Sequence, residues 1–218
     1  MPLYDFGPKA HTYDDFYKTE YGQIVDELEK RLVSSLVERV PRGKALEIGC
    51  GTGHWTVFFQ NKGFDVIGID ISEQMIAVAR EKYPQLNCQV ADAENLAQFP
   101  DASFDAVFAI TVLEFVDNPE KVIKQVKRIL KPKGYFLAGV LNKNSQLGRE
   151  KDSDETFRNA RFFSAQELHQ LLLNIGMDVK IDGCLVPEDG KFLDAEQQVD
   201  YDMRLDMGLF LAGLVLKS

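Results

Sequence analysis

The feature that most constrains this chain is a strand, a glycine turn and a helix in immediate succession from Lys44 onward. An apolar run typical of a buried strand leads into Gly49, Gly51 and Gly53, and aromatic residues then recur at helical spacing. A glycine turn at a helix N-terminus lets the backbone approach a ligand closely and directs unpaired N–H groups toward it. We therefore expect a ligand site at this turn, suited to a carboxylate, a phosphate or a ribose hydroxyl.

The spacing of the glycines argues against a dinucleotide as the ligand. The dinucleotide fingerprint reads G-x-G-x-x-G, and His54 stands where its third glycine is due. Glu47, two residues before the first glycine, would repel a pyrophosphate but could attract the cationic end of an amino acid. An NAD(P)-dependent oxidoreductase therefore stays open only as the weaker alternative.

A second apolar run, residues 66–70, ends in the carboxylate of Asp70. In doubly wound sheets a carboxylate at the end of the second strand is placed to accept hydrogen bonds from both hydroxyls of a ribose. The alternative role, capping the next helix, falls more naturally to Ser72. Asp92 follows the short third strand at residues 89–91, where it could accept from the exocyclic amine of adenine or belong to a solvated loop.

Apolar runs and helical patterns alternate along the chain, which predicts an α/β fold with helices on both faces of a parallel sheet. No helical pattern separates the last two strands, so we expect the last strand to run antiparallel. The prediction is one domain over residues 1–218 with a doubly wound, mostly parallel seven-stranded sheet. Its strands are expected near residues 44–48, 66–70, 89–91, 104–110, 135–141, 179–186 and 209–216.

Composition excludes several classes of protein. The net charge of −9 would repel a nucleic-acid backbone, so we expect no nucleic-acid partner. Cys50, Cys88 and Cys184 lie far apart with no C-x-x-C pair, which predicts neither a metal site nor a disulfide framework and favours a reducing cytoplasm. No apolar run is long enough to cross a bilayer, and no export signal is expected at the N-terminus.

Between about residues 44 and 141 the motifs resemble the class I S-adenosylmethionine (SAM)-dependent methyltransferases. LEIGCGTG, the strand ending in Asp70, VADAENL and FDAVFAITVLEFVDNPEKVIKQVKRILKPKG follow in the order seen in the methyltransferase type 11 branch, which includes ubiquinone- and menaquinone-biosynthesis enzymes. The resemblance implies a Rossmann-like fold, SAM as cofactor, S-adenosylhomocysteine as product and a small-molecule methyl acceptor. A SAM-binding protein with different chemistry, or with a sensing role, would keep the same motifs.

The resemblance also implies which residues bind the cofactor. The methionine end would meet Glu47, Gly49, Cys50, Gly51, Gly53 and Thr111, the ribose Asp70, the adenine faces Ile71 and Met75, and the adenine edge Asp92 and Ala93. Many relatives carry a histidine in the segment occupied here by residues 114–116, so the role of a histidine base does not transfer. Correct alignment alone can supply roughly 7–11 kcal/mol to methyl transfer, and no catalytic residue is assigned.

The two ends of the chain carry two further expectations. Residues 1–21 are predicted to form a mobile lid over the cofactor, with Tyr13 nearest to it, or else to staple the first helix, expected within residues 22–40, to the sheet. Its aromatic residues are Tyr4, Phe6, Tyr13, Phe16, Tyr17 and Tyr21, of which Phe16 and Tyr17 are expected to anchor it. Residues 142–218 would supply loops on the substrate side, where the acidic segment 187–206 favours a neutral or cationic acceptor.

Overall fold

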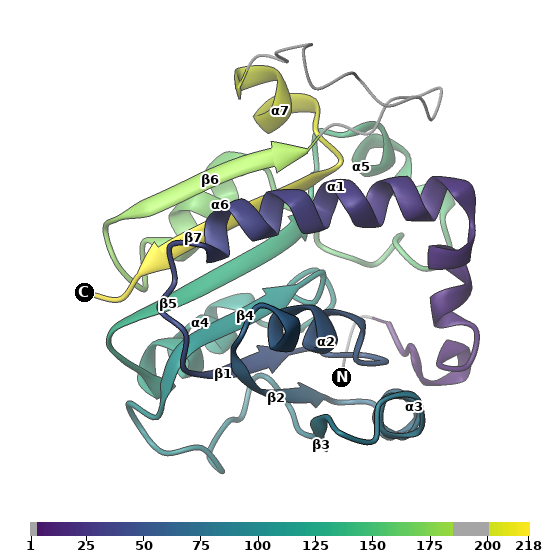
Figure 1. Cartoon of the computed structure of the whole chain (residues 1–218). Coiled ribbons are helices and arrows are strands. Elements are labelled where there is room, and N and C mark those ends of the chain that lie inside the picture. The colour runs from purple at the N-terminus through teal and green to yellow at the C-terminus, as the bar shows by residue number, and fades with distance from the viewer. Residues whose placement is uncertain (1–3, 185–200) are drawn as a thin grey trace.

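The computed structural model of the chain describes residues 4–184 and 201–218. Its centre is a seven-stranded sheet in the order β3-β2-β1-β4-β5-β7-β6 (Figure 1). The strands are β1 (Lys44–Ile48), β2 (Asp65–Asp70), β3 (Asn87–Val90), β4 (Phe104–Ile110), β5 (Leu130–Leu141), β6 (Val179–Cys184) and β7 (Phe210–Leu216).

The predicted α/β fold with an antiparallel last strand is confirmed. Strands β1 to β5 pair in parallel, and β7 lies between β5 and β6 and runs antiparallel to both. The expectation of no helix before the last strand is wrong, because α7 (Tyr201–Met207) precedes β7. Antiparallel neighbours do not need a crossover helix between them, so this short helix leaves the strand direction unchanged.

Helices cover both faces of the sheet (Figure 1). The long helix α1 (Glu20–Val37) and α2 (His54–Asn61) pack on the face that carries Ala45, whereas α4 (Pro119–Ile129) and α6 (Ala165–Leu172) pack on the face that carries Leu46. Successive residues of a strand point to opposite faces, and burial on both faces explains why β1 reads as one continuous apolar run. Beside α2, helix α3 (Glu73–Lys82) packs on β2 and β3.

The sequence encodes the starts of these helices through capping side chains. Ser72 accepts a hydrogen bond from the Met75 N–H at the start of α3, and Asn118 accepts one from the Lys121 N–H at the start of α4. Ser164 forms the predicted capping box at α6. Each such cap satisfies an N–H group that has no partner within its helix.

Two segments differ from what their local sequence favours. The sequence KPKG at residues 131–134 favours a turn, but it forms an irregularity inside β5, which already begins at Leu130 because that residue pairs with Phe104 of β4. The polar segment 142–161 shows no clear helical pattern, yet it contains α5 (Gln146–Glu150) and the 3-10 helix Lys151–Ser153. The described part of the chain holds no helix of the length and apolarity that a membrane span requires.

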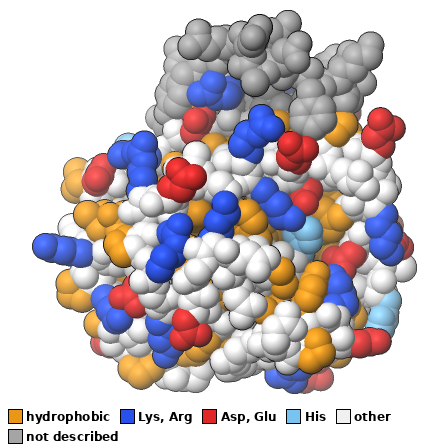
Figure 2. All heavy atoms as spheres, in the orientation of Figure 1, with side chains coloured by type: hydrophobic (Ala, Val, Ile, Leu, Met, Phe, Trp, Pro, Cys, Tyr) orange, Lys and Arg blue, Asp and Glu red, His pale blue; other side chains and the backbone are white. Residues whose placement is uncertain are grey.

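The surface mixes charges of both signs. Figure 2 shows lysine and arginine side chains interspersed with aspartate and glutamate over the face that α1 crosses. Beneath this face, the carboxyl ends of β1, β2 and β4 meet at one edge of the sheet. Ligands of doubly wound sheets bind at this edge, which locates the site described next.

Candidate functional site

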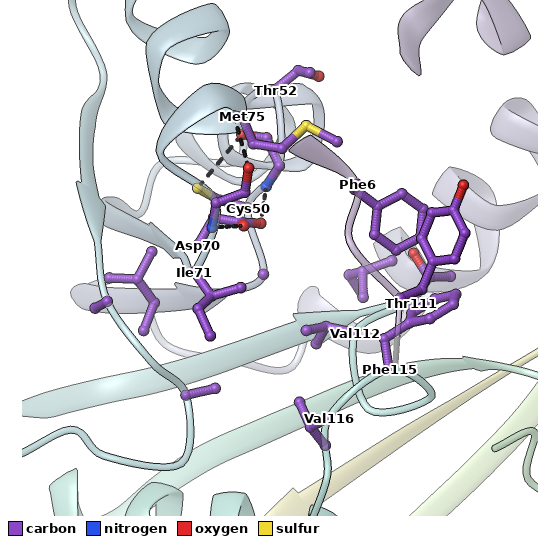
Figure 3. A pocket seen from close by; sticks show the side chains of 18 of the residues that line it. Phe6, Cys50, Thr52, Asp70, Ile71, Met75, Thr111, Val112, Phe115 and Val116 are labelled. Atoms are coloured by element: carbon purple, nitrogen blue, oxygen red, sulfur yellow. Dashed lines mark hydrogen bonds between the residues drawn. The ribbon is translucent and has the colours of Figure 1, made fainter. Parts of the chain in front are cut away.

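A cavity of about 750 Å³ opens at the carboxyl ends of β1, β2 and β4. Pockets for small ligands typically measure roughly 300–1,000 Å³, so its size suits a nucleoside-containing ligand with room beside it. Figure 3 shows Cys50, Asp70, Ile71 and Met75 on one side of the space and Phe6, Thr111 and Phe115 on the other. Ten of the twelve predicted site residues line it: Tyr13, Gly49, Cys50, Gly51, Asp70, Ile71, Met75, Asp92, Ala93 and Thr111.

The glycine turn forms the floor of the cavity. Gly49, Gly51 and Gly53 all have positive φ angles, of 70°, 52° and 87°. Residues other than glycine rarely adopt this backbone conformation. A Cβ atom at Gly49 would lie 2.4 Å from Val112, whereas one at Gly51 would meet nothing within 4 Å. The backbone at Gly51 therefore borders open space, as close approach of a ligand requires.

Asp70 joins this turn to the next helix. Its Oδ2 accepts a hydrogen bond from the Gly51 N–H at 2.9 Å, and its Oδ1 accepts one from the Ser72 N–H at 2.8 Å. Burial raises the pKa of this carboxyl, and the backbone hydrogen bonds oppose that rise. A carboxylate has about four acceptor positions, so the two that remain are available to ribose hydroxyls.

The walls beside Asp70 match a flat, partly polar ring. Ile71 is 51% exposed and Met75 is buried, and both line the cavity. Asp92 and Ala93 line it from the loop after β3, where Asp92 Oδ1 also accepts from the Glu94 N–H at 2.8 Å. Ile71 and Met75 present apolar surface, as expected for the faces of adenine. Asp92 presents a carboxylate beside Ala93, as expected for the edge of adenine.

Thr111 is held in an unusual backbone conformation at the end of β4. Its φ is 47°, although it is a β-branched residue, and its N–H donates to the Gly139 carbonyl at 2.8 Å. Strained residues of this kind persist where the surrounding structure enforces them, and they cluster at functional sites. The side chain of Thr111 lines the cavity.

Two predicted residues do not line the cavity. Gly53 is the N-cap of α2, and Glu47 is buried on the α2 face of the sheet beside Thr56. Burial raises the pKa of Glu47 to about 8, and its Oε2 has no hydrogen-bond partner in the described part of the chain. Direct contact of Glu47 with a ligand therefore stays a prediction.

The N-terminal segment supplies one wall of the cavity, and Tyr13 is the residue of this segment that the sequence analysis predicts for the site. Phe6 packs edge-on against Phe115 with ring centroids 4.9 Å apart, and together with Tyr13 it contacts the cluster that contains Met75. Phe6 and Phe115 were not predicted as site residues. The aromatic density of residues 4–21 was the available signal for Phe6, but aromatic content does not specify which ring meets which wall.

Asp14 links this segment to the glycine turn and to α3. Its Oδ1 accepts from the Thr52 hydroxyl at 2.7 Å, and its other oxygen pairs with Lys82 of α3. Tyr17 stacks on His54 with ring centroids 3.9 Å apart. The second expected anchor, Phe16, is 43% exposed, so its role as an anchor stays a prediction.

His54 and Glu114 have partners that fit structural roles. His54 Nε2 lies 2.7 Å from Asp26 Oδ1 on α1. Glu114 is fully buried, and its Oε1 accepts from the Leu141 N–H at 2.6 Å, whereas its Oε2 has no partner among the described residues. Burial raises the pKa of Glu114 to about 8. Within residues 4–184 and 201–218, no group of three or more His, Cys, Asp or Glu residues could hold a metal ion.

Comparison with known proteins agrees with this geometry. Residues 46–138 match a family model described as a methyltransferase domain. An uncharacterized Methanocaldococcus jannaschii protein, MJ1123, is 36% identical over 169 residues, covering 74% of this chain and 79% of that protein. A ubiquinone biosynthesis O-methyltransferase of Idiomarina loihiensis is 36% identical over 105 residues, covering 46% of this chain and 43% of that enzyme.

A solved structure extends the match over the whole fold. A SAM-dependent methyltransferase of Thermotoga maritima, described as a possible histamine N-methyltransferase, superimposes with a TM-score of 0.80 at 28% identity, covering 98% of both chains. The chain belongs to the SAM-dependent methyltransferase family, and its cofactor is SAM. The oxidoreductase alternative is thereby set aside, since the matched family model, the Idiomarina loihiensis enzyme and the Thermotoga maritima structure are all described as methyltransferases.

The first prediction concerns Asp70. Replacing Asp70 with Ala should weaken SAM binding by on the order of 2–4 kcal/mol, because two ribose hydroxyls lose a charged acceptor. Asp65→Ala is the matched control, since Asp65 is an exposed residue at the opposite end of β2. Isothermal titration of both variants measures the effect. Equal affinity of Asp70→Ala and the parent would remove Asp70 from the site.

The second prediction concerns Glu114 and pH. A carboxyl whose folded pKa is raised from 4.5 to about 8 contributes stability that is complete below pH 4.5 and is lost as pH rises through 8. Glu114→Gln cannot ionise but keeps an acceptor for the Leu141 N–H. Relative to the parent, its free energy of unfolding should rise by on the order of 3 kcal/mol between pH 5 and pH 9.

Urea denaturation at both pH values measures this difference. The exposed Glu81→Gln should follow the parent at both pH values. A Glu114→Gln curve parallel to that of the parent would show that the Glu114 carboxyl is ionised throughout this range.

Proposed function

We propose that this protein transfers the methyl group of SAM to a small-molecule acceptor that is neutral or cationic. The observation that carries the proposal is the extent of the cavity, which continues from the glycine turn to an inner wall made by Tyr17, His54, Trp55 and Ile110. None of these four residues is among those assigned to adenosine. The chain closes the space with its own N-terminal segment, which favours a small acceptor over a polymer.

SAM would supply an electrophilic methyl group on a sulfonium, and the described residues fit its binding. Asp70 offers free acceptor positions to the ribose, and the turn at Gly51 offers backbone approach without steric conflict. The chain's own contribution is to fix the reacting groups in line and to exclude water with Phe6, Phe115 and Val116. Alignment of this kind can contribute roughly 7–11 kcal/mol, so an activated side chain is not required for a good nucleophile.

Charge around the inner wall supports a neutral or cationic acceptor. Asp26 and Glu29 of α1 lie near Tyr17, and Lys30 is already paired with Asp26 at 2.7 Å. Glu29 is buried, and its burial together with the nearby Asp26 and Glu114 raises its pKa to about 8. Asp26 is the ionised carboxylate that a phosphate would meet here, because burial alone would raise its pKa but its hydrogen bonds to His54 and Lys30 lower it. The acidic segment 187–206 that motivated this expectation lies largely outside the described residues.

The relatives offer specific candidates for the acceptor. The Thermotoga maritima neighbour is described as a possible histamine N-methyltransferase, and a cationic amine would suit the acidic inner wall. A [4+2]-cyclase, SpnF, is 27% identical with a TM-score of 0.55, covering 70% of this chain and 60% of that chain, so a SAM-binding protein with chemistry other than methyl transfer is the second candidate for this chain.

Methyl transfer from labelled SAM tests the proposal. We expect label in an amine or hydroxyl compound of a small-metabolite extract, and in histamine or ethanolamine rather than in phosphoethanolamine. Asp70→Ala should abolish the signal at limiting SAM, and Asp65→Ala should retain it. Preferential labelling of phosphoethanolamine would overturn the charge argument. SAM binding without transfer to any fraction would favour the second candidate.

We further infer that residues 4–21 act as a lid over bound SAM. Phe6 and Tyr13 bridge the α3 side of the cavity to the turn after β4, and Asp14 bonds to both Thr52 and Lys82. These contacts span the cavity mouth, whereas a segment that only stapled α1 to the sheet would not need them. The lid would keep water from the sulfonium.

Asp14 and its neighbour Asp15 provide a matched test of the lid. Asp14→Ala removes both bonds to the cavity and should weaken SAM binding about tenfold, whereas Asp15→Ala removes only the exposed pair with Lys18 and should have little effect. Hydrogen exchange of residues 8–20 should slow on addition of SAM. Identical exchange with and without SAM, together with equal affinities of the two variants, would mean that the segment is a staple.

A further inference from the structure

We propose that Cys50 and Cys88 form an oxidisable pair whose disulfide switches off the SAM site. The proposal depends on the assignment of SAM as cofactor, but the bond itself can be detected without SAM. Cys50 lies in the glycine turn and lines the cavity, and Cys88 lies in β3 at the edge of the sheet. They are 38 positions apart in the sequence, and only the fold brings them together.

A glycine in the strand between them makes room for the contact. Cys88 pairs with Gly68 of β2, and a Cβ atom built at Gly68 would lie 3.0 Å from both Cβ and Sγ of Cys50. The Cys50 side chain therefore lies directly over Gly68, within one strand spacing of Cys88. The two thiols interact with each other and share an apolar cluster with residues of α3. Gly68 is the neighbour that the two cysteines share, since Cys88 pairs with it across the strands and the Cys50 side chain lies against it. A disulfide would need their Cα atoms to lie roughly 4.4–6.8 Å apart.

The surroundings of the two cysteines give their thiols different roles. The pKa of Cys88 is lowered, first by the Cys50 thiol and then by Thr56 and the positive charge of Arg80. Arg80 is fixed there by two hydrogen bonds to the Cys88 carbonyl, at 3.0 and 2.8 Å. The pKa of Cys50 is raised by the same contact with Cys88 and by burial. Because the thiolate is the reactive form, Cys88 is the nucleophile and Cys50 the resolving thiol.

Hydrogen peroxide is a sufficient oxidant for this pair. The Cys88 thiolate attacks one peroxide oxygen, so that an S–O bond forms as the O–O bond breaks, and the departing hydroxide takes up a proton to become water. The Cys50 sulfur then attacks the Cys88 sulfenic acid. The S–S bond forms as the S–O bond breaks, and the Cys50 proton leaves with the hydroxyl group as a second water.

The disulfide would act on the cofactor site through the backbone. Cys50 stands between Gly49 and Gly51, whose positive φ angles shape the turn, and the Gly51 N–H holds Asp70. Drawing the Cys50 side chain toward β3 would move this turn away from the position that SAM requires. Bound SAM would oppose the same movement, because binding and oxidation are reciprocally linked.

Peroxide treatment of the reduced full chain tests the proposal. We expect a peptide pair linked through Cys50 and Cys88 in non-reducing mass spectrometry, and SAM affinity lowered at least tenfold and restored by dithiothreitol. Saturating S-adenosylhomocysteine should slow formation of the linked peptide at least fivefold.

Three variants separate this switch from general thiol damage. Cys88→Ser should bind SAM like the reduced parent and should keep its affinity after peroxide, with Cys88→Ala as the second version if the serine variant folds poorly. Cys184→Ser should behave as the parent, since Cys184 lies in β6, the edge strand on the other side of the sheet from β3. Absence of the linked peptide, or equal peroxide sensitivity of the parent and the Cys88 variants, would overturn the proposal. Failure of the reduced parent to bind SAM would instead contradict the cofactor assignment.

Discussion

The site depends on two hydrogen bonds that the carboxylate of Asp70 accepts. One oxygen holds the Gly51 N–H of the glycine turn and the other holds the Ser72 N–H at the start of α3. The same side chain thus sets the position of the turn after β1 and of the helix after β2. Hydrogen bonds to a charged group are worth roughly 1.5–3 kcal/mol each, which is enough to fix two loops before any ligand binds. The Asp70 carboxylate is therefore already held in place at the site predicted for the ribose.

The free-energy cost of burying a charge sets the protonation of three glutamates. Glu29, Glu47 and Glu114 are all buried, and burial raises the pKa of each to about 8. Burying an acidic group costs folding free energy, and carboxyls whose pKa is raised toward 7 occur preferentially at functional sites. None of the three lines the cavity, and Glu114 is among the charges that raise the pKa of Glu29. Below pH 8 these carboxyls are mostly protonated and act as neutral hydrogen-bonding groups.

Packing of the N-terminal segment couples the site to parts of the chain that are distant in sequence. Asp14 reaches both the glycine turn, through Thr52, and α3, through Lys82. Phe6 reaches Phe115 in the turn after β4. Access to the cavity, the position of the glycine turn and the surroundings of Cys50 therefore depend on the same few loops.

The sequence by itself determined the order of the strands along the chain, several helix starts and ten residues that the fold brings to the cavity. Gly49, Gly51 and Asp70 could be assigned because a left-handed turn needs glycine and a strand end positions its carboxylate, which are local constraints. Only the tertiary structure decided the rest. The early start of β5 follows from pairing with β4, and the approach of Cys50 to Cys88 follows from strand order, neither of which has a local signal. Burial of Glu47 beside α2 likewise depends on packing, because one strand residue points to the helix and the next to the opposite face.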